Sequence, residues 1–174
     1  ITDIEIILPS NPNYLCSNPD LFGYRICDDN DPDGPVYSWT EITPSLGGSG
    51  IVHNLSDDGS LPVALPFPVL IYGQIFNRVF INANGNLTFS IGSTAHLNGS
   101  LPRGGGPGIF PFWDDLDDGA GGDICSDYDP SRGTFIVEWN DVPRYDELGN
   151  ETFQVVLYDT AVYGAPGGNS LTEI

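Results

Sequence analysis

Carboxylates are the side chains of this sequence best placed to do chemistry, and they gather in two short stretches. The first, D-D-N-D-P-D-G at residues 28–34, contains the D-x-D-x-D-G spacing of a calcium loop, formed by Asp29, Asp31 and Asp33. In such loops alternate carboxylates point inward and the glycine permits a sharp turn. The twelfth loop position is Thr40 instead of a bidentate glutamate, so a solvated acidic turn is the alternative.

The second stretch, P-F-W-D-D-L-D-D-G at residues 111–119, places four carboxylates within five residues. Like charges so close together raise one another's pKa unless a cation or solvent screens them. Hard oxygen ligands favour Ca²⁺ over a transition metal. We therefore expect either a calcium site or an exposed acidic loop that follows a buried aromatic strand, and the candidate ligands are Asp114, Asp115, Asp117 and Asp118.

The sequence gives little sign of a catalytic site. A pair of carboxylates can hydrolyse glycosides, but any acid-rich sandwich offers some pair at a suitable separation. The glycine-rich G-G-S-G at residues 47–50 lacks the G-x-S-x-G spacing of a nucleophile elbow, and neither His53 nor His96 has a sequence neighbour that marks it as a base. We expect a protein that is not an enzyme.

The elements that must position these residues are short strands. Turn residues recur every eight to twelve positions, and no segment shows a sustained helical period. This pattern predicts an all-β fold, an antiparallel β-sandwich of jelly-roll or immunoglobulin-like type. Asn84-Gly85 can supply the positive φ angles of a type I′ turn, which predicts a hairpin over residues 78–90. The other expected strands cover residues 1–8, 36–42, 60–65, 69–72, 133–139 and 152–158.

The composition excludes some partners. The chain has 5 Lys and Arg against 24 Asp and Glu, which gives a formal net charge of −19. Phosphate backbones and anionic lipids repel such a chain, so we expect no nucleic-acid partner. The longest apolar run, residues 61–72, contains three prolines and is too short to span a bilayer, so we expect no membrane insertion. The chain begins at Ile1 without the features of a signal peptide, which indicates a processed chain.

Cysteines and glycosylation sequons indicate a location outside the cell. Cys16 and Cys27 can close a small disulfide loop, although pairing of Cys27 with Cys125 is equally allowed, and one thiol remains in either case. The N-x-S/T sequons exceed the chance number slightly, which fits a secreted, glycosylated surface. They contain Asn54, Asn86, Asn98 and Asn150. We expect an extracellular or cell-surface protein, with unmodified sequons as the alternative.

Several segments of the chain occur in a characteristic order. They are F-G-Y-R-I-C-D-D-N-D-P-D-G-P-V-Y-S-W-T-E-I, L-P-F-P-V-L-I-Y-G-Q-I-F-N-R-V-F-I-N-A-N-G-N-L-T-F, I-F-P-F-W-D-D-L, F-I-V-E-W-N-D-V-P-R-Y and T-F-Q-V-V-L-Y, and they span residues 20–160. This ordered set resembles the nidogen-like extracellular modules, most of all the β-sandwich modules appended to secreted bacterial proteases and surface proteins. The resemblance implies a non-catalytic adhesion or accessory module, although a fold-level likeness alone does not fix function.

The end of the chain departs from that family pattern. In such modules the T-F-Q-V-x-L-Y strand is followed by a further strand, whereas this sequence gives only N-S-L-T-E-I. A sandwich without its last strand would have an edge that invites a strand from another chain. The N-terminal segment I-T-D-I-E-I-I-L could supply that strand, because one of its faces carries Ile4, Ile6 and Leu8 and a proline-containing linker follows. An ordinary first strand of its own sandwich is the alternative.

Two functional hypotheses follow. In the first, residues 1–12 are a β arm and linker, and residues 13–174 are one sandwich domain that a neighbouring subunit's strand completes. Head-to-tail exchange of the arm would build a pilus-like homopolymer, glycosylated and stabilised by calcium. In the second, the chain is a monomeric adhesion module or carbohydrate-binding accessory module that contacts surface glycans. Its sugar-stacking candidates are Trp39, Trp113, Trp139, Tyr145 and Tyr158, although aromatic residues in strand patterns more often belong to a core.

Overall fold

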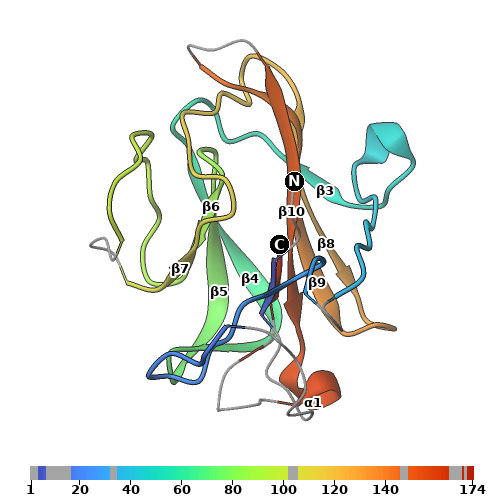
Figure 1. The fold of residues 1–174 in the computed structure, drawn as a ribbon. Coiled ribbons are helices and arrows are strands. Elements are labelled where there is room, and N and C mark those ends of the chain that lie inside the picture. The colour runs from blue at the N-terminus through green and yellow to red at the C-terminus, as the bar shows by residue number, and fades with distance from the viewer. Residues whose placement is uncertain are drawn as a thin grey trace.

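Two antiparallel sheets face each other in a β-sandwich, which confirms the predicted fold class (Figure 1). The computed structural model describes residues 4–6, 17–31, 35–101, 106–145, 149–164, 170 and 172–174, and for residues 4–6 it describes only the backbone. The seven-stranded sheet has the order β2-β1-β11-β10-β9-β8-β3, and the four-stranded sheet has the order β4-β5-β6-β7. The strands are β1 (Ile4–Ile6), β2 (Cys27–Asp28), β3 (Ile51–His53), β4 (Ser60–Ile71), β5 (Gln74–Asn82), β6 (Asn86–Thr88), β7 (Gly108–Ile109), β8 (Asp123–Asp129), β9 (Thr134–Pro143), β10 (Asn150–Tyr158) and β11 (Thr172–Glu173), and the helices are a short 3₁₀ helix (Pro44–Leu46) and α1 (Thr160–Tyr163).

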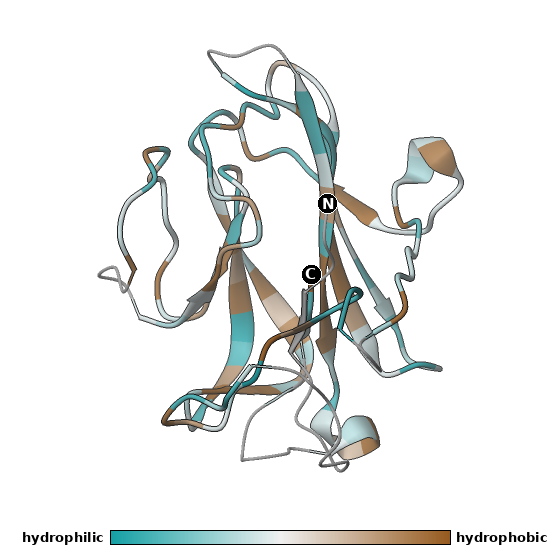
Figure 2. Cartoon of the chain, in the orientation of Figure 1, coloured by the Kyte–Doolittle hydropathy of each residue, from teal (hydrophilic) through white to brown (hydrophobic). Residues whose placement is uncertain are grey.

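The core lies between the two sheets, because strands of both sheets turn large apolar side chains toward each other. Trp139 of β9 is fully buried and stacks on Phe153 of β10, with ring centroids 4.9 Å apart. Its indole N–H donates a hydrogen bond to the carbonyl oxygen of Asn82 on the opposite sheet, at 3.2 Å. Figure 2 shows hydrophobic bands along strands of both sheets. Other core residues include Val69, Ile71, Val79, Ile81, Leu87, Phe89, Phe135, Val137, Val155 and Leu157.

The outer face of the seven-stranded sheet is also covered. Ile42 packs there against Cys125, Ile136 and Val156, in a second apolar cluster. The strand expected over residues 36–42 is wrong, because this segment has no regular structure and lies across the outward side chains of the sheet. Its backbone bonds to a side chain instead of to a strand, since the N–H of Ile42 donates to the carboxylate of Glu138 at 3.2 Å.

The hairpin predicted over residues 78–90 is present as β5 and β6. Asn82 and Asn86 form the pair that closes it, so the loop has three residues and not two. Gly85 alone among these loop residues has a positive φ, of 70°, which is typical of a three-residue hairpin loop with glycine in the left-handed region. The predicted type I′ turn is therefore wrong. A side chain at Gly85 would also lie 1.9 Å from the carbonyl oxygen of Phe112.

The N-terminal strand lies in the chain's own sheet. β1 pairs with β2 on one side and with β11 on the other, where Ile6 lies opposite Thr172. β11 in turn pairs with β10 at Val156 and Leu157, so a short last strand is present. This arrangement agrees with the alternative of an ordinary first strand and gives no support to an arm lent to a neighbour. The side chains of Ile4 and Ile6 and the whole of Leu8 lie outside the described residues.

None of the helices in the described ranges has the length and apolar character needed to cross a membrane.

Candidate functional site

Two acidic loops that are far apart in the sequence meet at the β5–β6 turn. One loop precedes β4 and contains Asp57 and Asp58, and the other contains Asp115, Asp117 and Asp118. Asn84, which is almost fully buried, connects them: its amide nitrogen donates to Asp58 Oδ1 at 2.8 Å, and its amide oxygen accepts from the N–H of Leu116 at 2.9 Å. We call the assembly of Asp57, Asp58, His96, Asp115, Asp117 and Asp118 the acidic cluster.

The acidic cluster contains a possible set of metal ligands. Asp58, His96 and Asp115 each offer one ligand atom, and these atoms lie within 4.8 Å of one another. His96 Nδ1 is 3.5 Å from Asp58 Oδ1, a distance that an ion pair or a shared cation would both produce. Aspartate oxygens outnumber the imidazole in the cluster, which favours a hard cation such as Ca²⁺.

Two carboxylate oxygens of the acidic cluster are buried without a hydrogen-bond donor among the described residues. They are Oδ1 of Asp57 and Oδ1 of Asp118, whereas Asp118 Oδ2 accepts from the N–H of Leu55 at 2.8 Å. Burial raises the pKa of Asp57, and the nearby Asp117 and Asp58 raise it further. Burial also raises the pKa of Asp118, with a further contribution from Asp117. Buried carboxylates without donors fit a site that gains from a bound cation.

Sequence reasoning found only part of the acidic cluster. Asp115, Asp117 and Asp118 were candidates, but Asp57, Asp58 and His96 were missed. The signal that could have found the aspartates is the S-D-D-G turn at residues 56–59, which repeats the paired acids of the later loop. Asp114, the remaining candidate, is not part of the three-ligand group, and its Oδ1 accepts the N–H of Asp115 at 3.0 Å.

The other predicted calcium loop has its carboxylates bonded to its own turn. Asp31 Oδ2 accepts the N–H of Asp28 at 3.0 Å, Asp28 Oδ1 accepts the N–H of Asn30 at 2.8 Å, and Asp29 Oδ1 accepts from the Asn30 side chain at 3.0 Å. Asp33 lies outside the described residues. In the part of the chain that is described, this geometry favours the alternative of a solvated acidic turn.

Three of the four sequon asparagines are accessible. Asn54, Asn98 and Asn150 are exposed, although the Asn150 amide donates to Asp141 at 2.9 Å. Asn86 is 0% exposed: its amide oxygen accepts from Asn82 at 2.8 Å, and its amide nitrogen donates to the carbonyl oxygen of Asn84 at 3.1 Å. The fold leaves no room for a glycan on this nitrogen, so the expectation for Asn86 does not fit the structure.

The cysteines separate into one bonded and one free residue. Cys27 is fully buried and disulfide-bonded, whereas Cys125 is a buried free thiol whose pKa burial raises to about 11. The alternative pairing of Cys27 with Cys125 is therefore wrong. The pairing of Cys16 with Cys27 stays a prediction, because Cys16 lies outside the described residues.

Each of the two histidines has a polar side chain as its neighbour. His53 Nε2 lies 2.8 Å from Ser126 Oγ, and burial lowers the His53 pKa. His96 faces the carboxylate of Asp58 in the acidic cluster.

The predicted sugar-stacking residues do not form one platform. Trp139 is in the core, the Trp39 indole donates to Glu41 at 3.4 Å, and the Tyr158 hydroxyl bonds to Glu173. Tyr145 is 56% exposed on its loop. Trp113 is buried at the wall of a cleft and donates to the carbonyl oxygen of Ala95 at 2.7 Å.

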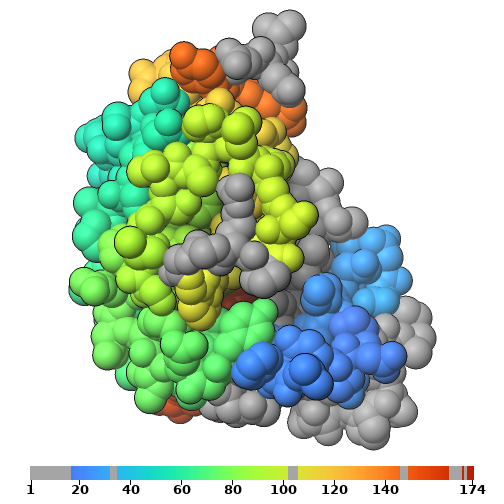
Figure 3. Space-filling model, turned by 90° about the vertical axis from the view of Figure 1, so that its left-hand side faces the viewer, coloured from blue at the N-terminus to red at the C-terminus, as the bar shows by residue number. Residues whose placement is uncertain are grey.

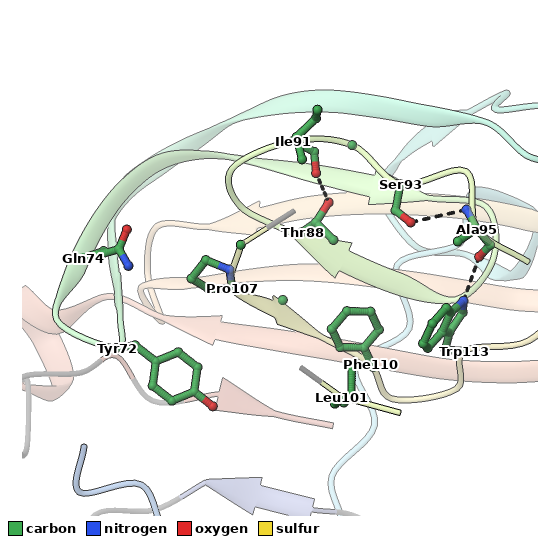
Figure 4. A pocket seen from close by; sticks show the side chains of 13 residues that line it. Tyr72, Gln74, Thr88, Ile91, Ser93, Ala95, Leu101, Pro107, Phe110 and Trp113 are labelled. Carbon is green, nitrogen blue, oxygen red and sulfur yellow. Dashed lines mark hydrogen bonds between the residues drawn. The ribbon is translucent and has the colours of Figure 1, made fainter. Parts of the chain in front are cut away.

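That cleft opens on the side of the four-stranded sheet and has a volume of about 750 Å³. Figure 4 shows Tyr72 and Gln74 at one end and Phe110 and Trp113 at the other. Residues 17–31 lie beside the end of this sheet (Figure 3), where the ring of Phe22 meets that of Tyr72 at 5.0 Å. A second cleft of about 550 Å³ lies beside β10 and is lined by Trp39, Phe112 and Gln154, among others.

Comparison with known proteins places these features in a family. The chain matches the family described as NIDO related over residues 36–162. It is 30% identical to alpha-tectorin of Mus musculus over a region that covers 62% of this chain and only 6% of alpha-tectorin. No solved structure matches the chain significantly. The expected nearness to modules of bacterial proteases gains no support from these comparisons. Since the matched range takes up most of the sequence and most of the sandwich, the chain belongs to the NIDO-related family.

Proposed function

We propose that this chain is a non-catalytic adhesion or binding module of a larger extracellular protein. The observation that carries the proposal is the family match over residues 36–162, together with a relative in which the similar region is a small fraction of the length. The disulfide at Cys27 and the exposed sequon asparagines fit an oxidising, extracellular location. Binding of surface glycans or of matrix proteins is the activity that this proposal assigns.

The assembly state of the purified chain tests this proposal against the filament hypothesis. The module should elute as a monodisperse monomer in size-exclusion chromatography with light scattering, because β1 already pairs with β2 and β11 of its own chain. It should also be retained on immobilised glycans or matrix proteins in a panel assay. Concentration-dependent polymers that disappear when residues 1–9 are deleted would overturn the proposal in favour of strand exchange.

We also propose that the acidic cluster holds a calcium ion that stabilises the module. The residues fit such an ion, because Asp57 and Asp118 each bury one oxygen without a donor among the described residues. Asp58 and Asp115 would supply further oxygen ligands, with His96 beside them. The ion would supply only charge neutralisation, and its effect would be to hold the loop before β4 against the loop of residues 114–118.

Thermal unfolding with and without chelator tests the calcium proposal. At a free calcium concentration of about 100 times the Kd, binding to the folded state adds about 2.7 kcal/mol, which should raise the Tm of a domain of this size by roughly 5–10 °C. Asp118→Asn should remove most of this increase, whereas Asp29→Asn, in the self-bonded turn of residues 28–31, should leave it unchanged. A Tm that is equal in EDTA and in calcium would rule out the ion, and an increase with zinc that His96→Ala removes would assign the site to a transition metal.

A further inference from the structure

Within the described residues, one edge of the strand β10 is paired along only part of its length. The strand pairs with β9 from Asn150 to Tyr158, but on its other side it pairs with β11 only at Val156 and Leu157. Among the described residues, the stretch 151–155 therefore has a strand neighbour on one side only, and we call this stretch the open edge. Backbone N–H and C=O groups on such an edge are available for pairing with another strand.

The cleft of about 550 Å³ lies at the open edge. Its lining includes Gln154, whose side chain points to the outer face of the sheet, and Phe153, whose side chain points into the core. Trp39 closes the outer side and Phe112 the inner side, and Ile174 lies at the end where β11 stops. Residues from both faces of β10 line this cleft. The cleft therefore occupies the place in which the next strand of the sheet would run.

Gln154 gives this cleft an unsatisfied polar group. The residue is only 6% exposed, yet neither its amide oxygen nor its amide nitrogen has a hydrogen-bond partner among the described residues. Leaving such groups buried and unpaired is costly, so a native structure is expected to satisfy them with a ligand or solvent. One donor and one acceptor side by side are complementary to a peptide group.

The charge around the cleft favours a basic ligand. Three carboxylates line it, those of Asp29, Glu151 and Glu173. The charge of Glu151 is offset by Arg144, whose Nε donates to it at 2.7 Å. The remaining lining is largely apolar, and it includes the aromatic rings of Trp39 and Phe112. Apolar walls below an acidic rim suit a segment that alternates an apolar side chain with lysine or arginine.

We propose that the open edge of β10 binds an extended, basic peptide segment of a partner protein by strand addition, with the Gln154 amide bonded to the added backbone. In this mode main-chain hydrogen bonds provide affinity, and the side-chain pockets select alternate residues. The inference rests on the proposed role as a binding module and names the partner chemistry of one site. It requires no exchange of strands between copies of this chain.

Synthetic peptides test the proposal directly. The probe is a seven-residue peptide of alternating valine and lysine, and its controls are the valine–glutamate peptide and a valine–lysine peptide with alternate backbone nitrogens methylated. We expect saturable binding of the first peptide in calorimetry and slower hydrogen exchange of the amides of residues 151–155. Both controls should fail, because the first is repelled by the acidic rim and the second cannot donate backbone hydrogen bonds. Equal binding of the methylated peptide would overturn strand addition, since charge attraction alone would then explain the affinity.

The variant Gln154→Leu separates binding from folding. Leucine has a similar volume and no unsatisfied polar atoms, so the Tm should stay equal or increase. Peptide affinity should fall about tenfold, which is the loss expected when about 1.4 kcal/mol of hydrogen bonding is removed. Unchanged peptide affinity in this variant would contradict the proposal. So would slow hydrogen exchange of the amides of residues 151–155 that is seen without peptide and depends on protein concentration. If peptides fail but the chain still binds glycans or matrix proteins, only the strand-addition site is wrong and the proposed function stands.

Discussion

The carboxyl group of Glu138 links the pH of the solution to the attachment of residues 36–50 on the outer face of the sheet. Glu138 is 0% exposed, and its two oxygens accept from the N–H of Ile42 at 3.2 Å and from the hydroxyl of Thr43 at 2.7 Å. Its pKa is raised from 4.5 to about 6, chiefly by burial and to a smaller extent by the nearby charge of Glu41, while the hydrogen bonds from Thr43 and Ile42 oppose part of this increase. The folded protein therefore holds this proton more tightly than the unfolded chain does.

The sign and size of the effect follow from this difference. Because the folded pKa lies above the unfolded one, the stabilising contribution of protonated Glu138 is fully present below about pH 4.5 and is lost as the pH rises through about 6. A pKa increase from 4.5 to about 6 corresponds to about 2 kcal/mol, at about 1.4 kcal/mol per pH unit. We expect Glu138 alone to make the domain about 2 kcal/mol less stable at pH 7.5 than at pH 4.

Urea unfolding of wild type and Glu138→Gln, measured from pH 4 to pH 7.5, isolates this contribution. Glutamine keeps the shape but does not ionise, so all other titrating groups cancel when the two curves are subtracted. The variant should gain stability relative to wild type as the pH rises, with the midpoint of the gain about halfway between the unfolded pKa of 4.5 and the folded pKa of about 6. Glu41→Gln is the matched variant, and it should move that midpoint to lower pH because it removes a neighbouring charge. Parallel curves for wild type and Glu138→Gln would refute the reasoning.

Three further predictions concern packing and modification. Trp139→Ala should lower the free energy of unfolding by about 3–5 kcal/mol in urea titrations, because it empties the centre of the core and removes the stacking partner of β10. Gly48→Ala should also destabilise the domain, by about 1–3 kcal/mol, because the added Cβ would lie 2.1 Å from the backbone carbon of Ile42. In glycopeptide mass spectrometry of secreted material Asn86 should be unmodified, and a glycan found there would contradict its buried position.

The sequence predicts most of the fold. It does not predict that residues 36–50 cover the outer face of the seven-stranded sheet. Alternation in T-F-I-V-E-W-N predicts β9 correctly, because the inward residues Phe135, Val137 and Trp139 are all apolar. The outward Ile136 also packs in an apolar cluster, since residues 36–50 cover that face. The strands β3 and β8 were not predicted: β3 has only three residues, and β8 carries aspartates at both ends. Local patterns are weak where pairing depends on partners far away in the chain.

The acidic cluster shows the same limit. Its residues come from turns near positions 57, 96 and 117, and nothing in the local spacing connects them. Asn84 joins two of these turns through the hydrogen bonds of its side chain. In the sequence, the Asn-Gly pair indicates only a hairpin and not this contact. The sequon at Asn86 is likewise a local motif that does not reveal burial, whereas in the fold Asn86 accepts a hydrogen bond from Asn82, which also donates to Thr88.

The pairing of β1 with β11 determines how the domain would respond to mechanical tension. The two strands are antiparallel neighbours, with Glu5 opposite Glu173 and Ile6 opposite Thr172, so Ile4 and Ile174 lie at the same end of the pair. Backbone hydrogen bonds between antiparallel strands run perpendicular to the strands. A pull that separates these two ends would load the bonds one after another, as in opening a zipper, instead of shearing them together. The short strands β1 and β11 would therefore detach at low force, while the sandwich formed by β3 to β10 stays folded.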